Sequence, residues 1–248
     1  MKYKNFGPEI WDRIDQVIDL AKSKQTQQFA AFDADGTLWD TDLGESFFKF
    51  QIKNNLLPNL PKDPWRHYRD WKESGDPRPA YLWLAQINQG QTIDTVRSWA
   101  ESCVKEIVPL PIFEEQKRLI EKLQSAKIKV YIITASVQWA VEPGAIRLGV
   151  PKENVIGVKT KIMNGKVTNE QDGEMTYKEG KSKALLTVTK NIKPILSCGN
   201  TMGDFSLLEN SVELSLAVGA AIESSELFPT EEKLREEARK RNWLIHRF

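Results

Sequence analysis

Short apolar runs alternate along this chain with longer stretches in which apolar residues return every three or four positions. The short runs predict buried strands, and the longer stretches predict amphipathic helices. The predicted strands lie at 29–32, 129–134, 194–198 and 213–218, and the segment 155–168 adds a short strand and a hairpin turning at Asn164-Gly165. The predicted helices cover 8–24, 42–56, 64–73, 79–88, 92–107, 111–126, 138–148, 180–191, 203–210 and 230–241.

The order of these elements predicts the fold class. From residue 111 onward strands and helices alternate, which indicates an α/β fold with parallel strands and helices on both faces. The helical block 41–108 interrupts this alternation directly after the first strand. We therefore expect a core domain made of 1–40 and 109–248, with 41–108 inserted as an all-helical cap over one edge of the sheet.

Composition narrows the functional classes. The 248 residues carry a net charge of +1 without a basic tail, so nucleic acid is not an expected partner. No apolar run approaches the length of a membrane span, and the N-terminus lacks the apolar segment of a signal peptide, so a membrane is not expected either. Cys103 and Cys198 lie far apart and outside any metal or redox motif, which favours a reducing, cytoplasmic location. Oligomeric state has no sequence signal.

Three predicted strands end in polar residues typical of functional sites. The first runs into 33–37 (DADGT), the second into 134–136 (TAS) and the third into 199–204 (GNTMGD). Ligands of parallel sheets bind beyond the carboxyl ends of the strands, so these segments are expected at one rim. That arrangement gathers four oxygen donors in a small volume: Asp33, Asp35, Asn200 and Asp204.

Such a group of carboxylates predicts a metal ion. Like charges a few ångströms apart repel, and a divalent cation removes the repulsion. The donors are oxygens, without a cluster of His or Cys, which favours Mg²⁺. With few protein ligands, Mg²⁺ keeps positions for water and for a substrate oxygen, typically of phosphate. Asp33, Asp35, Asn200 and Asp204 are therefore the predicted metal site.

The spacing of the first motif suggests a division of chemical roles. Asp33 at the strand end is a candidate nucleophile that forms an aspartyl-phosphate. Asp35 is placed to protonate the leaving alcohol and then deprotonate the attacking water. Gly36 permits close backbone approach to phosphate, and Thr134 offers a hydroxyl to its oxygens. A lysine near a helix start, Lys181 in preference to Lys183, supplies a positive charge.

These residues resemble the haloacid dehalogenase-like (HAD) hydrolase superfamily, in its phosphoserine-phosphatase-like and phosphocholine-phosphatase-like branch. Asp33-Ala-Asp-Gly-Thr37 matches the DxDxT motif, Thr134 the hydroxyl motif and Lys181 the lysine motif, and 200–204 occupies the acidic motif. The order is the same, and the resemblance covers roughly 28–220. It implies a Rossmann-like core, a helical cap, Mg²⁺ and phosphorylation of Asp33. One residue departs from the pattern: the acidic motif usually begins with Asp, and Asn200 here offers a neutral oxygen.

Substrate contacts are expected from both parts of the chain. On the core side the candidates are Gly36, Thr37, Ala135 and Ser136, although Ser136 is also placed to cap the next helix. On the cap side they are Glu45 and Arg97, which suit the ammonium and carboxylate of phosphoserine. The cap is rich in aromatic residues, most of them expected in its core, with two or three lining the pocket: Trp39, Phe47, Phe48, Trp65, Tyr68, Trp71, Tyr81, Trp83 and Trp99. Aromatic faces attract quaternary ammonium, which adds phosphocholine and phosphoethanolamine to the candidate substrates.

The sequence thus predicts a Mg²⁺-dependent phosphatase that acts on a small phosphorylated metabolite. A phosphotransferase that uses an acceptor alcohol in place of water is an alternative with the same residues. A catalytically weak phosphate-binding protein is a further alternative, because Asn200 replaces a charged ligand. In the simplest structural interpretation Asp33 and Asp35 only cap a turn, and Asn200 and Asp204 only begin a helix.

Overall fold

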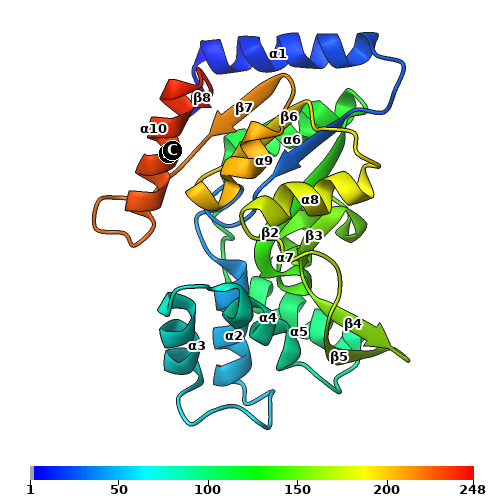
Figure 1. Ribbon diagram of the computed structural model, residues 1–248, viewed down its shortest axis with the longest axis vertical. Helices are drawn as coiled ribbons and strands as arrows, with labels where there is room; N and C mark the ends of the chain where they lie inside the picture. The colour runs from blue at the N-terminus through cyan, green and yellow to red at the C-terminus, as the bar shows by residue number, and fades with distance from the viewer. Residues whose placement is uncertain (1–2) are drawn as a thin grey trace.

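The computed structural model describes residues 3–248, so residues 1 and 2, which the predicted core domain includes, lie outside it. Its centre is a six-stranded sheet in which every neighbouring pair is parallel, in the order β3-β2-β1-β6-β7-β8 (Figure 1). The strands are β1 (Phe29–Phe32), β2 (Lys129–Val137), β3 (Val155–Val158), β6 (Leu196–Gly199), β7 (Leu214–Ala217) and β8 (Leu244–Ile245). This confirms the predicted α/β class.

The central strands are apolar on both faces because helices cover both. In β1, Ala30 and Phe32 pack into one apolar cluster, whereas Phe29 and Ala31 pack into another on the opposite face. The first cluster includes α1 (Pro8–Ser23), α6 (Glu114–Ser125) and α7 (Gln138–Arg147). The second includes α8 (Glu179–Val188), α9 (Phe205–Glu209) and α10 (Phe228–Lys240). A strand covered by helices on both faces is apolar at every position, which explains the continuous apolar sequence of β1.

The segment between β1 and α6 is helical, as its periodicity predicts. It contains α2 (Leu43–Lys53), α3 (Pro64–Glu73), α4 (Arg78–Gln86) and α5 (Ile93–Glu106). Side-chain caps fix three of these starts, since Asp42, Asp63 and Thr92 each accept a hydrogen bond from the backbone N–H three residues on. Each such cap stabilises a helix by about 1 kcal/mol. The helices form the lower part of the molecule in Figure 1.

The apolar core of this lower part also draws on residues from beyond 108. Trp139 and Ala140 of α7 and Val167 of the hairpin pack into the same cluster as Phe47 and Phe48. The hairpin consists of β4 (Thr160–Met163) and β5 (Lys166–Gln171) and turns at Asn164-Gly165. Both turn residues have positive φ, of 51° and 75°, as the sequence predicts for a two-residue hairpin turn.

Backbone hydrogen bonds attach the hairpin to the helices. The N–H of Gly90 donates to the carbonyl of Val167, and the N–H of Val167 donates to the carbonyl of Gln91, each at 2.9 Å. The N–H of Ile93 donates to the carbonyl of Gly165 at 3.0 Å. The hairpin thus continues the lower part of the molecule, although the sequence groups it with the core.

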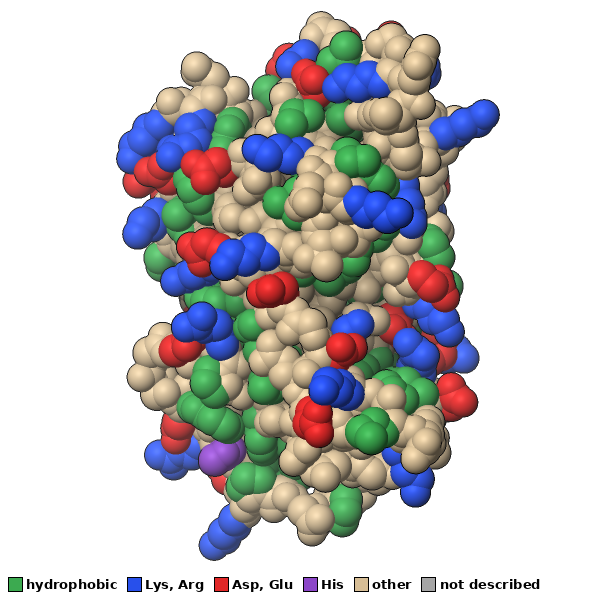
Figure 2. Space-filling view, turned by 45° about the vertical axis from the view of Figure 1, so that its right-hand side comes forward, with side chains coloured by type: hydrophobic (Ala, Val, Ile, Leu, Met, Phe, Trp, Pro, Cys, Tyr) green, Lys and Arg blue, Asp and Glu red, His purple; other side chains and the backbone are tan. Residues whose placement is uncertain are grey.

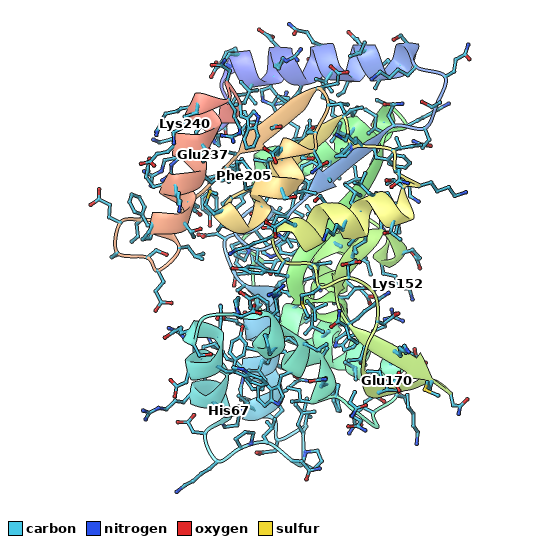
Figure 3. The ribbon with its side chains drawn as sticks, in the orientation of Figure 1. His67, Lys152, Glu170, Phe205, Glu237 and Lys240 are labelled. Carbon is cyan, nitrogen blue, oxygen red and sulfur yellow. The ribbon has the colours of Figure 1, made fainter. Side chains whose placement is uncertain are left out.

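The surface carries acidic and basic side chains side by side, without a patch of one sign on the face in Figure 2. Several charged and aromatic side chains, such as Lys152, Glu170 and His67, lie at the periphery, away from the strand ends (Figure 3). Within residues 3–248, no helix has both the length and the apolar character that a membrane span requires.

Candidate active site

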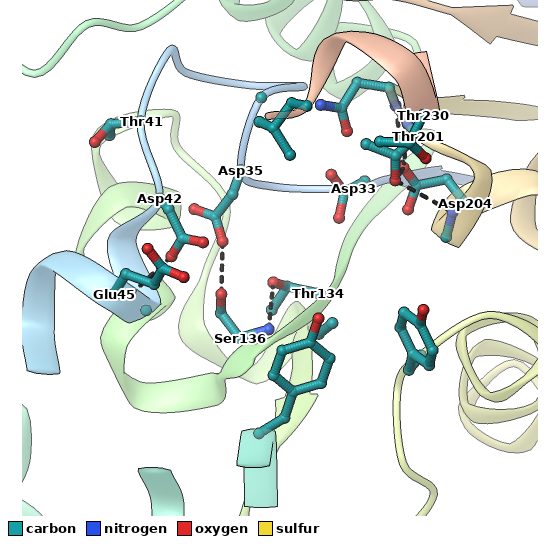
Figure 4. Close-up of a pocket in the computed structure, with 18 of the residues that line it drawn as sticks. Asp33, Asp35, Thr41, Asp42, Glu45, Thr134, Ser136, Thr201, Asp204 and Thr230 are labelled. Atoms are coloured by element: carbon teal, nitrogen blue, oxygen red, sulfur yellow. Dashed lines mark hydrogen bonds between the residues drawn. The ribbon is translucent and has the colours of Figure 1, made fainter. Parts of the chain in front are cut away.

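The site lies where β1 and β6 run side by side and their following loops separate. Phe32 pairs with Cys198, and the N–H of Asp33 donates to the carbonyl of Cys198 at 2.9 Å. In the sheet, β2 and β3 lie on one side of β1, and β6, β7 and β8 lie on the other. The loops after β1 and β6 therefore lead in opposite directions, and a crevice opens between them. A cavity of about 380 Å³ fills this crevice and reaches the helices below (Figure 4).

Residues from the strand ends, the helices below and α10 surround the cavity. Its lining includes Asp33, Asp35, Gly36, Asp42, Glu45, Tyr68, Lys72, Tyr81, Thr134, Ala135, Ser136, Tyr177, Lys181, Asn200, Thr201, Asp204, Thr230 and Glu231. Nearly all the predicted site residues are among them. The two predicted residues that do not line the cavity are Thr37 and Arg97.

Asp33, Lys181 and Asp204 form a buried charged group at the centre of the rim. The Lys181 ammonium donates to Asp33 Oδ1 and to Asp204 Oδ1, and all three residues are at least 95% buried. Asp204 Oδ2 also accepts from the backbone N–H groups of Asn200 and Thr201, at 3.1 and 3.0 Å. Lys183, the other candidate lysine, is exposed. The structure therefore places Lys181 in the site.

The charges in this group compete with one another. Burial raises the pKa of Asp33 to about 7, aided by the charge of Asp204 and opposed by Lys181. Burial also acts to lower the pKa of Lys181, but the carboxylates of Asp204 and Asp33 outweigh it and raise that pKa. At neutral pH Lys181 therefore carries its positive charge, whereas Asp33, in the absence of a further cation, is partly protonated.

Asp35 is held separately, on the side that faces the helices. Its Oδ1 accepts from the Trp39 indole N–H at 2.8 Å and from the Leu43 N–H at 2.9 Å. Its Oδ2 accepts from the Ser136 hydroxyl at 2.7 Å (Figure 4). Burial raises the pKa of Asp35, and the hydrogen bonds from Leu43, Ser136 and Trp39 partly offset this. These bonds fix the orientation that a general acid needs.

The end of β2 supplies Thr134, Ala135 and Ser136. The strand continues to Val137, three residues beyond the predicted end, so all three belong to it. Ser136 does not cap α7, whose capping position is Val137; the Ser136 hydroxyl instead bonds Asp35. The helix-cap interpretation of Ser136 is thus wrong, because the longer strand carries its side chain to the cavity. The Thr134 hydroxyl accepts from the Ser136 N–H at 3.0 Å.

Thr37 lies behind the cavity wall and links two of the oxygen donors. It is fully buried, and its hydroxyl lies 3.1 Å from Asp33 Oδ2 and 3.3 Å from Asn200 Oδ1. Gly36, with φ of 78°, turns the chain beside Asn200. Thr37 is therefore placed to hold the first motif together, and Gly36 lines the cavity.

Asp33, Asn200 and Asp204 fit a hard divalent cation. All three residues line one cavity, and Asp33 Oδ2 and Asn200 Oδ1 lie within hydrogen-bond reach of the same Thr37 hydroxyl. Two carboxylates and an amide suffice for Mg²⁺, which usually keeps several waters. Asp35 is not bonded to this group; its carboxylate accepts from Trp39 and Ser136 instead. Within the described part of the chain, no three His, Cys, Asp or Glu side chains gather as a metal site. The predicted four-residue set thus separates into three neighbouring donors and Asp35.

The far end of the cavity is acidic and aromatic. Lys72 Nζ lies 2.7 Å from Glu45 Oε1, and 5.7 and 6.0 Å from the ring centroids of Tyr68 and Tyr81. Asp42 lies beside Glu45 in Figure 4, and its pKa is raised by burial and by the charges of Asp35 and Glu45. This end therefore surrounds an ammonium group with carboxylates and ring faces.

Two of the expected aromatic residues, Tyr68 and Tyr81, line the cavity, together with Tyr177 from outside the helical block. No tryptophan of residues 3–248 is among the lining residues; the tryptophans of the lower part pack within or against its core. Arg97 instead forms a two-pronged ion pair with Glu142 of α7, at 2.7 and 2.9 Å. The structure does not bring Arg97 to the other predicted substrate contacts.

The lining residues that sequence reasoning missed include four with charged or aromatic side chains: Asp42, Lys72, Tyr177 and Glu231. Asp42 carried a signal, since its spacing to Glu45 is that of a helix cap and an acidic residue in the first turn. The others come from helices or loops whose contacts depend on the tertiary fold.

Comparison with known proteins shows the family to which this chain belongs. The profile of the haloacid dehalogenase-like hydrolases matches residues 30–209. A phosphorylcholine phosphatase of Pseudomonas aeruginosa is 26% identical over 206 residues, covering 68% of this chain; the chain matches 59% of that protein's length. A solved protein of unknown function from Bordetella pertussis Tohama I is similar with a TM-score of 0.73 and 17% identity, over 90% of this chain and 99% of that one.

A phosphoserine phosphatase solved as a phospho-aspartyl intermediate analogue is similar in fold. The TM-score is 0.55 at 15% identity, and the match covers 90% of this chain and 93% of that one.

Proposed function

We propose that this chain, which belongs to the haloacid dehalogenase-like hydrolase family, is a phosphatase that hydrolyses a small phosphomonoester carrying an ammonium group. The predicted family is confirmed by the match over residues 30–209, a range that contains all four motifs. The observation that supports the proposed activity most directly is the buried Asp33–Lys181–Asp204 group, open to a cavity that also holds Asp35.

The proposed reaction has two steps. The Asp33 carboxylate attacks phosphorus, forming an aspartyl-phosphate, while the bond from phosphorus to the alcohol oxygen breaks. Asp35 gives its proton to the leaving alcohol, which its raised pKa favours. Asp35 then takes a proton from water, whose oxygen attacks phosphorus and releases Asp33 and inorganic phosphate. Lys181 and the Thr134 hydroxyl bind the phosphoryl oxygens in both steps.

A bound Mg²⁺ would offset the negative charge of the phosphate, and Asp33, Asn200 and Asp204 would hold it. The family generally uses this ion, and the three oxygen donors suit it. Without it, Asp33 and Asp204 share the single ammonium of Lys181. Because Lys181 is needed for the phosphate, a second cation is required to keep both carboxylates charged.

The ammonium group of the proposed substrate is inferred from the far end of the cavity. Lys72 there forms an ion pair with Glu45 and lies over two tyrosine rings, so the site already stabilises an ammonium of this protein. Choline or ethanolamine offers the same charge, and aromatic faces bind quaternary ammonium well. The matched Pseudomonas protein is a phosphorylcholine phosphatase, which agrees with this choice. Phosphoserine is the competing candidate, and its carboxylate would need Lys72 as partner.

A substrate panel tests the proposal. Phosphate release is measured with phosphocholine, phosphoethanolamine, phosphoserine and p-nitrophenyl phosphate, with Mg²⁺ and with EDTA. We expect Mg²⁺-dependent release and the highest kcat/KM for the first two substrates. No release from any substrate with Mg²⁺, Mn²⁺ or Co²⁺ would contradict phosphatase activity. Release from phosphoserine alone would retain the activity and exclude the proposed substrate class.

A further inference from the structure

Asn200 stands where the family pattern has Asp, and its side chain is held on both sides. The residue is 1% exposed. Its Oδ1 lies 3.3 Å from the Thr37 hydroxyl, whose single hydrogen is shared with Asp33 Oδ2 at 3.1 Å. Its Nδ2 donates to Glu231 Oε1 at 3.3 Å, on the opposite side. The two bonds define which end of the amide faces the nucleophile.

Glu231 is itself fixed by further partners. It lies in the first turn of α10, is 1% exposed and lines the cavity. Its Oε2 accepts from the N–H of Ala221 at 3.2 Å and from Arg235 Nη1 at 3.4 Å. Its Oε1 is left for Asn200. A carboxylate has no N–H to donate, so it can bond only the amino end of the Asn200 amide.

Two glycines leave the space that this pair occupies. A Cβ on Gly36 would lie 2.1 Å from Asn200 Nδ2, and a Cβ on Gly219 would lie 2.2 Å from Glu231 Oε2. Gly36 also has a positive φ of 78°. The backbone thus approaches both partners closely, which favours one arrangement of the pair.

We propose that Glu231 is a positioning residue that turns the Asn200 oxygen toward Asp33 and supplies, behind it, the negative charge that Asp would carry in that place. The pair also explains the departure from the family pattern, because Asp at position 200 would set two carboxylates about 3.3 Å apart, and these repel each other unless one takes up a proton. Residues behind metal ligands orient them and tune the affinity. The proposal rests on the proposed Mg²⁺ site of this protein.

Mg²⁺ binding to four proteins tests it without turnover. The dissociation constant is measured by calorimetry, and the rise in melting temperature with Mg²⁺ is measured alongside, for wild type, Glu231→Gln, Asn200→Asp and the double variant. We expect each single variant to bind Mg²⁺ about tenfold more weakly. In the double variant, the amide introduced by Glu231→Gln can donate to the new carboxylate, so we expect binding within about threefold of wild type.

Glu232→Gln is the matched control. Glu232 is the adjacent residue and bonds Arg235 Nη2 at 2.6 Å, but it has no bond to Asn200. We expect unchanged Mg²⁺ affinity. An equal loss in this variant would assign the effect to Arg235 and overturn the proposal.

Two results separate failure of this inference from failure of the metal site. If wild type shows no Mg²⁺ binding, the proposed Mg²⁺ site itself is wrong. If wild type binds and Asn200→Asp binds as tightly or more tightly with Glu231 intact, only the role of Glu231 is refuted. The second result needs no Glu231 variant, so it holds even where Glu231→Gln does not fold.

Discussion

At the sheet end of the cavity, the side chains of Asp33, Lys181 and Asp204 are 8%, 4% and 1% exposed and form one bonded group. At the helical end, Glu45 and Lys72 are 17% and 32% exposed and form a single ion pair. Asp33 and Asp204 follow strands β1 and β6, which pair in register, and Lys181 lies in the first turn of α8. Glu45 and Lys72 project from helices α2 and α3. The comparison separates a rigid end suited to one reaction from an adaptable end suited to choosing the substrate.

The largest expected effect is that of Asp33→Asn. The variant keeps the size of the side chain and removes the nucleophile, so kcat is expected to fall by more than about 10³-fold. Steady-state phosphate release measures the loss, and the melting temperature shows that the protein is still folded. Activity above a few per cent of wild type would remove Asp33 from the nucleophile role.

Asp35→Asn is expected to slow both half-reactions by about 10²–10⁴-fold, the usual contribution of a general acid or base. Rapid-quench measurement of the alcohol burst reports the first step, and steady-state turnover reports the second. Asp63→Asn is the control, because Asp63 is a helix-capping carboxylate that does not line the cavity. If burst and turnover both match wild type, Asp35 has no part in proton transfer.

Mg²⁺ affinity is expected to depend on pH through Asp33. The pKa of Asp33 is raised to about 7, so below that pH Mg²⁺ must displace a proton from the carboxylate. Affinity should therefore rise up to about tenfold per pH unit below 7 and level off above it. Calorimetry between about pH 5.5 and 8.5 measures this. A flat profile in wild type, or the same slope in Asp33→Asn, would assign the proton to another group.

At the helical end, effects of roughly three- to tenfold in KM are expected. Lys72→Met removes the internal ammonium from Glu45, so KM for phosphocholine should fall; Glu45→Gln should raise it. Lys49→Met is the control, since Lys49 lies over Trp65, which does not line the cavity. A higher KM for phosphocholine in Lys72→Met would mean that Lys72 itself contacts the substrate.

The smallest catalytic effect is expected for Arg97→Met. Arg97 pairs with the buried Glu142 outside the cavity, so the change should lower the melting temperature and leave KM for every substrate unchanged. Thermal unfolding and KM for phosphoserine measure the two effects. A selective rise in KM for phosphoserine would restore the carboxylate-binding role that the sequence suggested.

The rigid end was predictable because it depends on local order. Asp33 directly follows β1, Thr134 lies in the last part of β2, and Lys181 and Asp204 lie near helix starts. Parallel pairing brings the carboxyl ends of the strands together whatever the loops do. The helical core was predictable in its helices and their starts. The residues that complete this core from elsewhere in the chain could not be predicted. Val167 of the hairpin and Trp139 of α7 pack into it although they lie far along the sequence.

The adaptable end was only partly predictable. Glu45 and two tyrosines were named in advance, but the tryptophans gave a misleading signal, since large aromatic residues serve a small helical core as well as a ligand site. Lys72 and Glu231 had no local signal at all. Which side of a helix faces a cavity depends on how that helix packs.

The hydrogen bonds between the β4–β5 hairpin and residues 90–93 limit how substrate can enter. A lid joined to its base by two linkers can swing open, but here a third attachment ties the helices to the segment that follows β3. We therefore expect the entrance of the cavity to widen through rotation of side chains such as Tyr81 and Tyr177, whose ring centroids lie 5.7 Å apart. With such an entrance, the width of a substrate limits its entry to the cavity before its charge contributes to binding.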